Sequence, residues 1–164
     1  MTPQNRRDFL FESLCSIIEP LTTPGTVELR RELTDALQGQ KSYLLPTLND
    51  DAFEELSFEH SQQTSAFKGQ TNFAIIIGVF ADGSAESIRV KSNALIDKVE
   101  RQFIKAFELV ENNGVLTLNE GGDNRRITIL SFGIVGNSPV KIQNEASAQT
   151  IGVFGTIDFA ETML

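Results

Sequence analysis

The sequence predicts one α+β domain, in which an antiparallel β-sheet of about four strands carries an N-terminal helix and one long amphipathic helix on one face. Two patterns support this prediction. In two segments, apolar residues recur at every third or fourth position, which is the period of a helix. Elsewhere they alternate with polar residues or form short apolar runs between turns, which is typical of strands. The chain of 164 residues matches the size of one domain.

The two helices are predicted for residues 8–19 and 87–110. Pro20 ends the first helix, because proline disfavours a helical conformation at the residue before it. Gly114 suits the left-handed residue that follows the second helix. The apolar stripe of the first helix comprises Leu10, Leu14, Ile17, Ile18 and Leu21, and that of the second comprises Ile88, Ser92, Leu95, Ile96, Val99, Phe103, Ala106, Phe107 and Val110.

The clearest strand covers residues 71–81, and we expect it to form an antiparallel hairpin with residues 53–67 around a turn at Lys68 and Gly69. This strand is apolar on both faces. Phe73, Ile75, Ile77 and Val79 share one face, and Ala74, Ile76, Gly78 and Phe80 share the other. Because helices are predicted for one face only, the second face needs another cover.

Two further strands are predicted at residues 127–135 and 150–159. Simple alternation places Ile127 and Ile129 on one face of the first of these strands. It places Leu130, Phe132 and Ile134 on the other face.

The connecting segments are predicted to be polar or variable. We expect polar loops at residues 119–126 and 136–149, and a short strand or loop at residues 115–118. Within the variable segment 22–52, residues 27–37 suit either a short helix or an extended stretch. Residues 44–51 of the same segment suit a short extended piece followed by a turn.

The composition restricts the possible partners. With 14 basic and 22 acidic residues the formal charge is −8, so phosphate backbones repel the chain and sequence-specific nucleic-acid binding is not expected. No apolar run reaches the roughly 20 residues that span a bilayer, and the N-terminal residues lack the apolar region of a signal peptide. We therefore expect no membrane partner. The single cysteine, Cys15, indicates a reducing compartment.

No catalytic, cofactor-binding or metal-binding site is predicted. His60 is the one histidine, and its neighbours along a strand point to opposite faces, which does not suit a catalytic array. Cys15 lies within a helical pattern and is expected to pack as a small hydrophobic residue. Glu55 and Glu59 would lie about 13 Å apart along a strand, which is too far for paired acid–base catalysis. We therefore do not expect an enzyme.

The expected function lies on the surface of the domain. A sheet of few strands with two apolar faces and helices on one side leaves the other side uncovered, and a second copy of the chain could cover it. The residues expected at this self-association surface are Ile76, Phe80, Leu130, Phe132 and Phe154. The residues expected in a partner-contact loop are Glu120, Asp123, Arg125 and Arg126.

The order of elements along the chain resembles that of the tail terminator proteins of tailed phages, a family that includes minor tail protein U and is similar to other tail-completion and neck proteins, and the resemblance covers about residues 53–164. The shared pattern begins with an N-terminal helix and an extended hairpin. Asp82, Gly83 and Ser84 then lead into a charged amphipathic helix, which is followed by a polar loop and a closing strand pair. The last strand of the pattern is IGVFGTIDFAET.

This resemblance implies a structural protein of the virion tail or neck that is present in the host cytoplasm during assembly. It implies a homo-hexameric ring that caps the tail tube, with further copies of itself, the tail tube protein and a head-side connector or neck protein as partners, and with no cofactor. The long segments 22–52 and 136–149 also suit a neck or head–tail joining protein. A small dimeric ligand-sensing α+β domain, with a pocket between helix and sheet, is a separate alternative.

Overall fold

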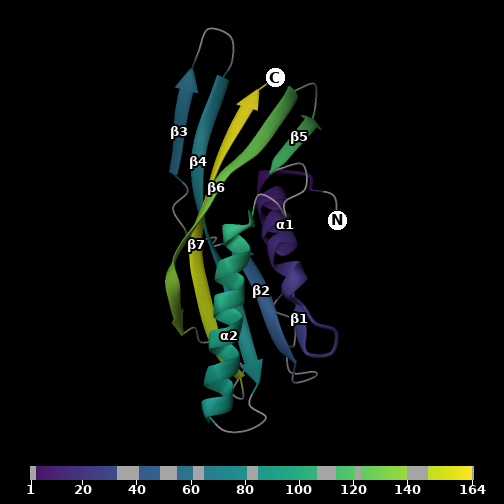
Figure 1. The fold of residues 1–164 in the computed structure, drawn as a ribbon. Coiled ribbons are helices and arrows are strands. Elements are labelled where there is room, and N and C mark those ends of the chain that lie inside the picture. The colour runs from purple at the N-terminus through teal and green to yellow at the C-terminus, as the bar shows by residue number, and fades with distance from the viewer. Residues whose placement is uncertain are drawn as a thin grey trace.

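The computed structural model describes residues 3–32, 41–48, 55–60, 65–80, 85–106, 114–120, 123–139 and 148–163. Over these residues the chain is an α+β protein, with one seven-stranded sheet and two α-helices that lie on the same side of it (Figure 1). The helical elements are α1 (Arg6–Ile18), the 3-10 turn η1 (Glu19–Leu21) and α2 (Ala85–Ile104). The strands are β1 (Val27–Leu29), β2 (Ser42–Leu48), β3 (Glu55–His60), β4 (Ser65–Phe80), β5 (Val115–Glu120), β6 (Asp123–Pro139) and β7 (Ala148–Met163).

The sheet is built around three long strands. Its order is β1-β2-β4-β7-β6-β5, and β3 joins it by pairing with the first part of β4. All strand pairs are antiparallel except β1 with β2. β4, β7 and β6 have 16, 16 and 17 residues, and each therefore spans about 50 Å. In Figure 1 the end of the sheet that carries β3 extends past both helices.

The predicted fold class is confirmed as α+β with both helices on one face, but the prediction of about four antiparallel strands is wrong. The variable segment 22–52 contributes β1 and β2, which are parallel to each other, and residues 115–120 contribute β5. These short strands lie at or near the edges of the sheet. Their backbone groups gain hydrogen bonds by joining an existing edge, a gain that the side-chain pattern does not reveal.

α1 begins where the sequence supplies a cap. The side-chain oxygen of Asn5 accepts a hydrogen bond of 2.9 Å from the backbone N–H of Asp8. The helix ends ahead of Pro20, which lies in η1, as the sequence predicts. The apolar side chains that α1 buries are Phe9, Leu10, Leu14, Cys15, Ile17 and Ile18.

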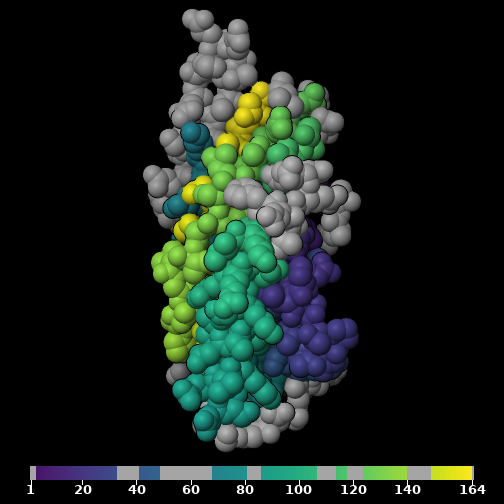
Figure 2. Space-filling view, viewed as in Figure 1, coloured from purple at the N-terminus to yellow at the C-terminus, as the bar shows by residue number. Residues whose placement is uncertain are grey.

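The main core lies between the two helices and the sheet face that they cover. β4 contributes Phe73, Ile75, Ile77 and Val79, and α2 contributes Leu95, Val99 and Phe103. The two helices are also linked directly, because the side-chain nitrogen of Gln102 donates a hydrogen bond of 3.0 Å to the carbonyl oxygen of Ile17. Figure 2 shows α1 and α2 side by side over this face, with β6 along the outer side of α2.

The turn predicted at Lys68 and Gly69 is wrong. Both residues lie inside β4, where they pair with β3 on one edge and with β7 on the other. The expected antiparallel hairpin is present, but its connection falls on residues 61–64, outside the described residues. Pairing on both edges of the strand outweighs the local preference of a Lys-Gly pair for a turn.

The two predicted polar loops are shorter than expected. β5 and β6 remain paired as far as Glu120 and Asp123, so most of residues 119–126 belongs to a hairpin. β6 continues to Pro139 and β7 begins at Ala148, so the described strands occupy both ends of the segment 136–149. Gly114 has the expected left-handed backbone, with φ of 75°.

Candidate functional site

The sheet face opposite the helices carries an apolar cluster of its own. Tyr43, Leu45 and Phe80 are buried there, and Ile76 packs against them. The centroids of the Tyr43 and Phe80 rings are 6.3 Å apart, and the guanidinium carbon of Arg30 lies 4.1 Å from the centroid of Tyr43. Only 8% of Phe80 is exposed. The chain therefore buries Tyr43, Leu45 and Phe80 by itself, and the covering of this face by a second copy stays a prediction.

Three of the residues expected at the self-association surface do lie on this face. Ile76 and Phe80 belong to the apolar cluster. Phe154 pairs with Ala74 in the same alternating set of positions and is partly buried. None of the three forms an open apolar surface in the single chain, because Ile76 and Phe154 are partly buried and Phe80 is buried.

Phe132 lies on the helix side instead of the expected face. Its ring meets that of Phe103 with centroids 5.6 Å apart and that of Phe73 with centroids 6.5 Å apart, both near edge to face. The cause is a β-bulge, because the register of β6 against β7 shifts just before Ser131 and the alternation restarts one residue later. Ile134 likewise packs against the main core. The faces predicted for Phe132 and Ile134 are therefore wrong.

Leu130 is the residue that this bulge leaves out of register, and 45% of it is exposed. It borders a shallow hollow of about 430 Å³ where β4, β7 and β6 lie next to one another. The residues that line the hollow are Lys68, Gly69, Gln70, Leu130, Ser131, Asp158 and Phe159.

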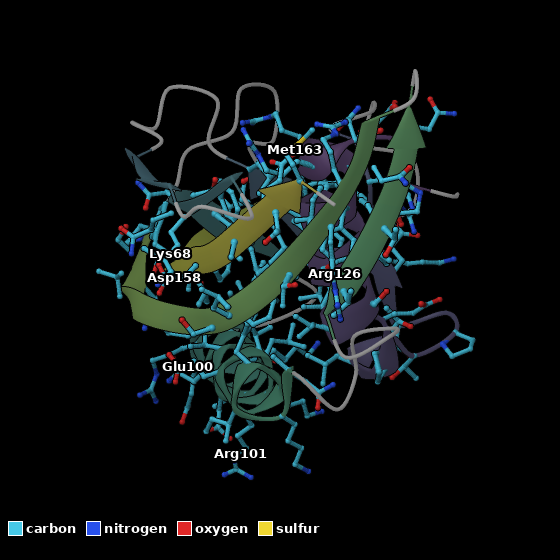
Figure 3. All side chains as sticks on the ribbon, turned by 90° about the horizontal axis from the view of Figure 1, so that it is seen from above. Lys68, Glu100, Arg101, Arg126, Asp158 and Met163 are labelled. Carbon is cyan, nitrogen blue, oxygen red and sulfur yellow. The ribbon has the colours of Figure 1, made fainter. Side chains whose placement is uncertain are left out.

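A row of polar side chains crosses this hollow. Asp158 accepts two hydrogen bonds, one of 2.9 Å from the side-chain nitrogen of Gln70 and one of 2.7 Å from the hydroxyl of Ser131. Lys68 and Asp158 lie next to each other on the same side of the sheet in Figure 3. Each oxygen of the Asp158 carboxylate thus has a donor within the chain. This part of the face is polar and differs from the apolar cluster around Tyr43.

The two side edges of the sheet are unlike. One side ends in β1 and β3, and the other ends in β5 and the second half of β6. β5 pairs with β6 only as far as Thr128. Within the described part of the chain, residues 131–139 of β6 pair with β7 alone. Their outer backbone groups therefore form an open strand edge.

Arg125, expected in a partner-contact loop, binds a buried carboxylate of its own chain. Glu161 has a side chain only 4% exposed, and its two oxygens lie 3.1 Å from Nη1 of Arg125 and 3.2 Å from Nη1 of Arg6. The guanidinium carbon of Arg6 also lies 5.0 Å from the centroid of the Phe159 ring. This cluster joins α1 to β6 and β7 through charge-assisted hydrogen bonds.

Arg126, also expected in the partner-contact loop, does not share a face with Arg125. Arg126 is exposed and is the next residue along β6, so it belongs to the opposite face from Arg125. Figure 3 labels its side chain. Glu120 and Asp123 are the last pair of the β5–β6 ladder. Their side chains lie outside the described part of the structure.

No known family model matches the chain, and no curated protein is similar to it in sequence. Among solved structures, the chain is similar to one from the virion of a native gene transfer agent particle. The two are 10% identical, the match covers 90% of this chain and 84% of the other, and the TM-score is 0.36.

Cys15 is confirmed as a buried residue, with 1% exposed, and burial raises the pKa of its thiol to about 11. It therefore stays protonated and unreactive near neutral pH. His60 lies in β3, and its side chain is outside the described part. In the described ranges no three His, Cys, Asp or Glu residues gather as metal ligands, and neither described helix has the length and apolar character of a transmembrane helix.

Sequence reasoning missed the roles of Glu161 and Asp158. A lone acidic residue in an apolar strand gives little indication of which cations approach it. The bulge did leave a signal, however. In β6 the apolar residues that face the helices are spaced by two, then three, then two positions, and the step of three indicates one extra residue. These residues are Ile127, Ile129, Phe132 and Ile134.

Proposed function

We propose that this chain is a structural virion assembly protein, and not an enzyme, that forms a ring at the end of a phage tail. In this role it caps the tail tube as a tail terminator and joins it to a head-side connector or neck protein. The order of its elements resembles that of tail terminators. The observation that carries the proposal is that, within the described residues, the sheet ends in two unlike edges, one at β1 and β3 and the other along residues 131–139 of β6.

Unlike edges favour a ring over a two-fold dimer. In a two-fold dimer the same surface of both copies must be self-complementary. A contact between two different edges is head-to-tail, and repeated head-to-tail contacts form a closed ring when the rotation between copies closes. The two unlike edges of this sheet, as the described strands form them, suit such a contact. A hexamer is the ring size expected from the resemblance.

Size-exclusion chromatography with light scattering tests the proposal. We expect either a species of about six times the 18.1 kDa of one chain, or a monomer that assembles when tail tubes are added. Negative-stain images should show rings, free or at tube ends, and the chain should stop the elongation of growing tubes. A stable dimer at every concentration, with and without tubes, contradicts the proposal.

The same preparation separates a terminator from a neck or head–tail joining protein. A terminator binds the ends of tail tubes in the absence of the connector. A neck or joining protein binds the isolated connector and leaves the elongation of tubes unchanged. Pelleting assays with each partner alone therefore distinguish the two roles.

The hollow beside Leu130 supports one second candidate, a small ligand-sensing domain. Its polar row around Asp158 offers fixed hydrogen-bonding groups. It lies on the face opposite the helices and not between helix and sheet, where such a pocket is expected from the sequence. Native mass spectrometry checks this candidate. A retained small molecule that Asp158→Ala releases would favour it, and an unliganded mass in both proteins would count against it.

A further inference from the structure

Two β-bulges in β6 each leave one apolar residue exposed. The register of β6 against β7 shifts between Ile129 and Ser131 and again between Ile134 and Gly136, so Leu130 and Val135 are the residues left out of register. Leu130 is 45% exposed and Val135 is 77% exposed. A β-bulge changes the direction in which side chains point. Edge strands that avoid pairing with another chain usually carry charged side chains. These two bulges present aliphatic side chains instead.

The edge that carries these residues is also uncharged. No Asp, Glu, Lys or Arg stands between Arg126 and Lys141. Each chain has a formal charge of −8, so two copies repel each other unless they meet through a surface that brings no like charges together. Residues 131–139 of β6 meet that condition, and within the described part of the chain their outer edge is open.

We propose that residues 131–139 of β6 are the edge on which a second copy of this chain docks in the ring, with Leu130 and Val135 as the apolar residues that the neighbouring copy buries. This inference rests on the proposed ring and specifies its contact surface. The backbone groups of the open edge pair with an edge strand of the next copy. Leu130 and Val135, the aliphatic residues at the two bulges, supply the apolar contacts with that copy.

Lysine substitutions test the inference. We expect Leu130→Lys and Val135→Lys each to raise the protein concentration needed for assembly at least tenfold, measured by light scattering. The double variant should remain monomeric. Both side chains are exposed, so circular dichroism spectra and melting temperatures should stay near those of the wild type. The matched controls are Val90→Lys and Ile104→Lys, which are 58% and 84% exposed and belong to α2 and not to the open edge of β6. These controls should assemble normally.

Hydrogen–deuterium exchange provides a second measurement. The amides of residues 131–138 should gain protection in the assembled wild type relative to the dissociated chain, since Pro139 has no N–H. If the wild type assembles and the Leu130 and Val135 variants assemble equally well, the assignment of residues 131–139 as the docking edge is wrong, while the ring proposal stands. If the wild type forms no ring with or without tail tubes, both fail. Protection of these amides by the tail tube protein, without contact between copies, also overturns the assignment.

Discussion

Gly78 lies directly opposite Tyr43 in the pairing of β4 with β2, and the tyrosine ring occupies the space that a side chain at position 78 would fill. A Cβ atom at Gly78 would fall 2.1 Å from Cε1 of Tyr43, well inside van der Waals contact. Tyr43 is fully buried, with the Arg30 guanidinium against its ring. The glycine therefore makes room for the apolar cluster on the face opposite the helices.

Gly78→Ala is expected to destabilise the protein by about 1–3 kcal/mol, because the methyl group forces the buried Tyr43 ring to move. Urea denaturation measures the change. Gly136→Ala is the matched control, since no atom lies within 4 Å of a Cβ at that position, and its effect should be within about 0.5 kcal/mol. Equal stabilities of the two variants would contradict this account of the cluster.

Glu161→Gln is expected to lower the free energy of unfolding by about 2 kcal/mol. The neutral side chain leaves the partly buried Arg6 and Arg125 without their shared, buried carboxylate. The comparison is Asp97→Asn, which removes the exposed pair of Asp97 with Arg101 and should change stability by less than about 0.5 kcal/mol. A Glu161→Gln protein as stable as Asp97→Asn would show that the buried cluster is not stabilising.

Phe132→Ala distinguishes a core residue from an interface residue. Because its ring packs against Phe73 and Phe103, we expect a loss of about 2 kcal/mol in stability. Leu130 is the bulge residue itself and is 45% exposed, so Leu130→Ala should lower the stability by less than about 1 kcal/mol. Thermal denaturation of the dissociated chains measures both. Normal stability of Phe132→Ala together with weaker assembly would favour the sequence-based placement of Phe132 on the outer face.

The buried thiol of Cys15 is expected to make the protein less stable at alkaline pH. Its thiol pKa is raised from 9.0 to about 11 by burial, so the unfolded chain gives up this proton at lower pH than the folded chain does. The stabilising contribution is complete below pH 9.0 and is lost as pH rises toward about 11. Unfolding free energies of the wild type and Cys15→Ala, compared across this range, isolate the effect from other titrating groups. Parallel pH profiles of the two proteins would contradict it.

Several elements of the fold were predictable from local patterns. The stripe that includes Leu10, Leu14 and Ile17 predicts α1, and Pro20 predicts its end. The two-sided apolar run around Ile75 predicts a strand between two covered faces, and β4 has an apolar cluster on each face. The edge strands β1 and β5 were harder to predict, because edge strands are short and their side chains carry little apolar signal.

The candidate surface was predicted only in part. Leu130 was expected on the outer face and is exposed there, whereas Phe132 was assigned to the same face by strict alternation. The extra residue Leu130 reverses the side chains that follow it as far as the second bulge, so one unrecognised bulge moved Phe132 to the helix side. Its aromatic partner on α2, Phe103, lies 29 positions earlier in the chain, and that contact has no local signature.

The sequence by itself determined the class of fold, the positions of both helices and the central two-sided strand, because these depend on periodic burial of neighbouring residues. Only the tertiary structure decided which strands form the edges, where β6 bulges, and which arginines meet Glu161. These features depend on contacts between segments far apart in the chain. Their energies come from backbone pairing and burial that become defined only when the whole sheet has formed.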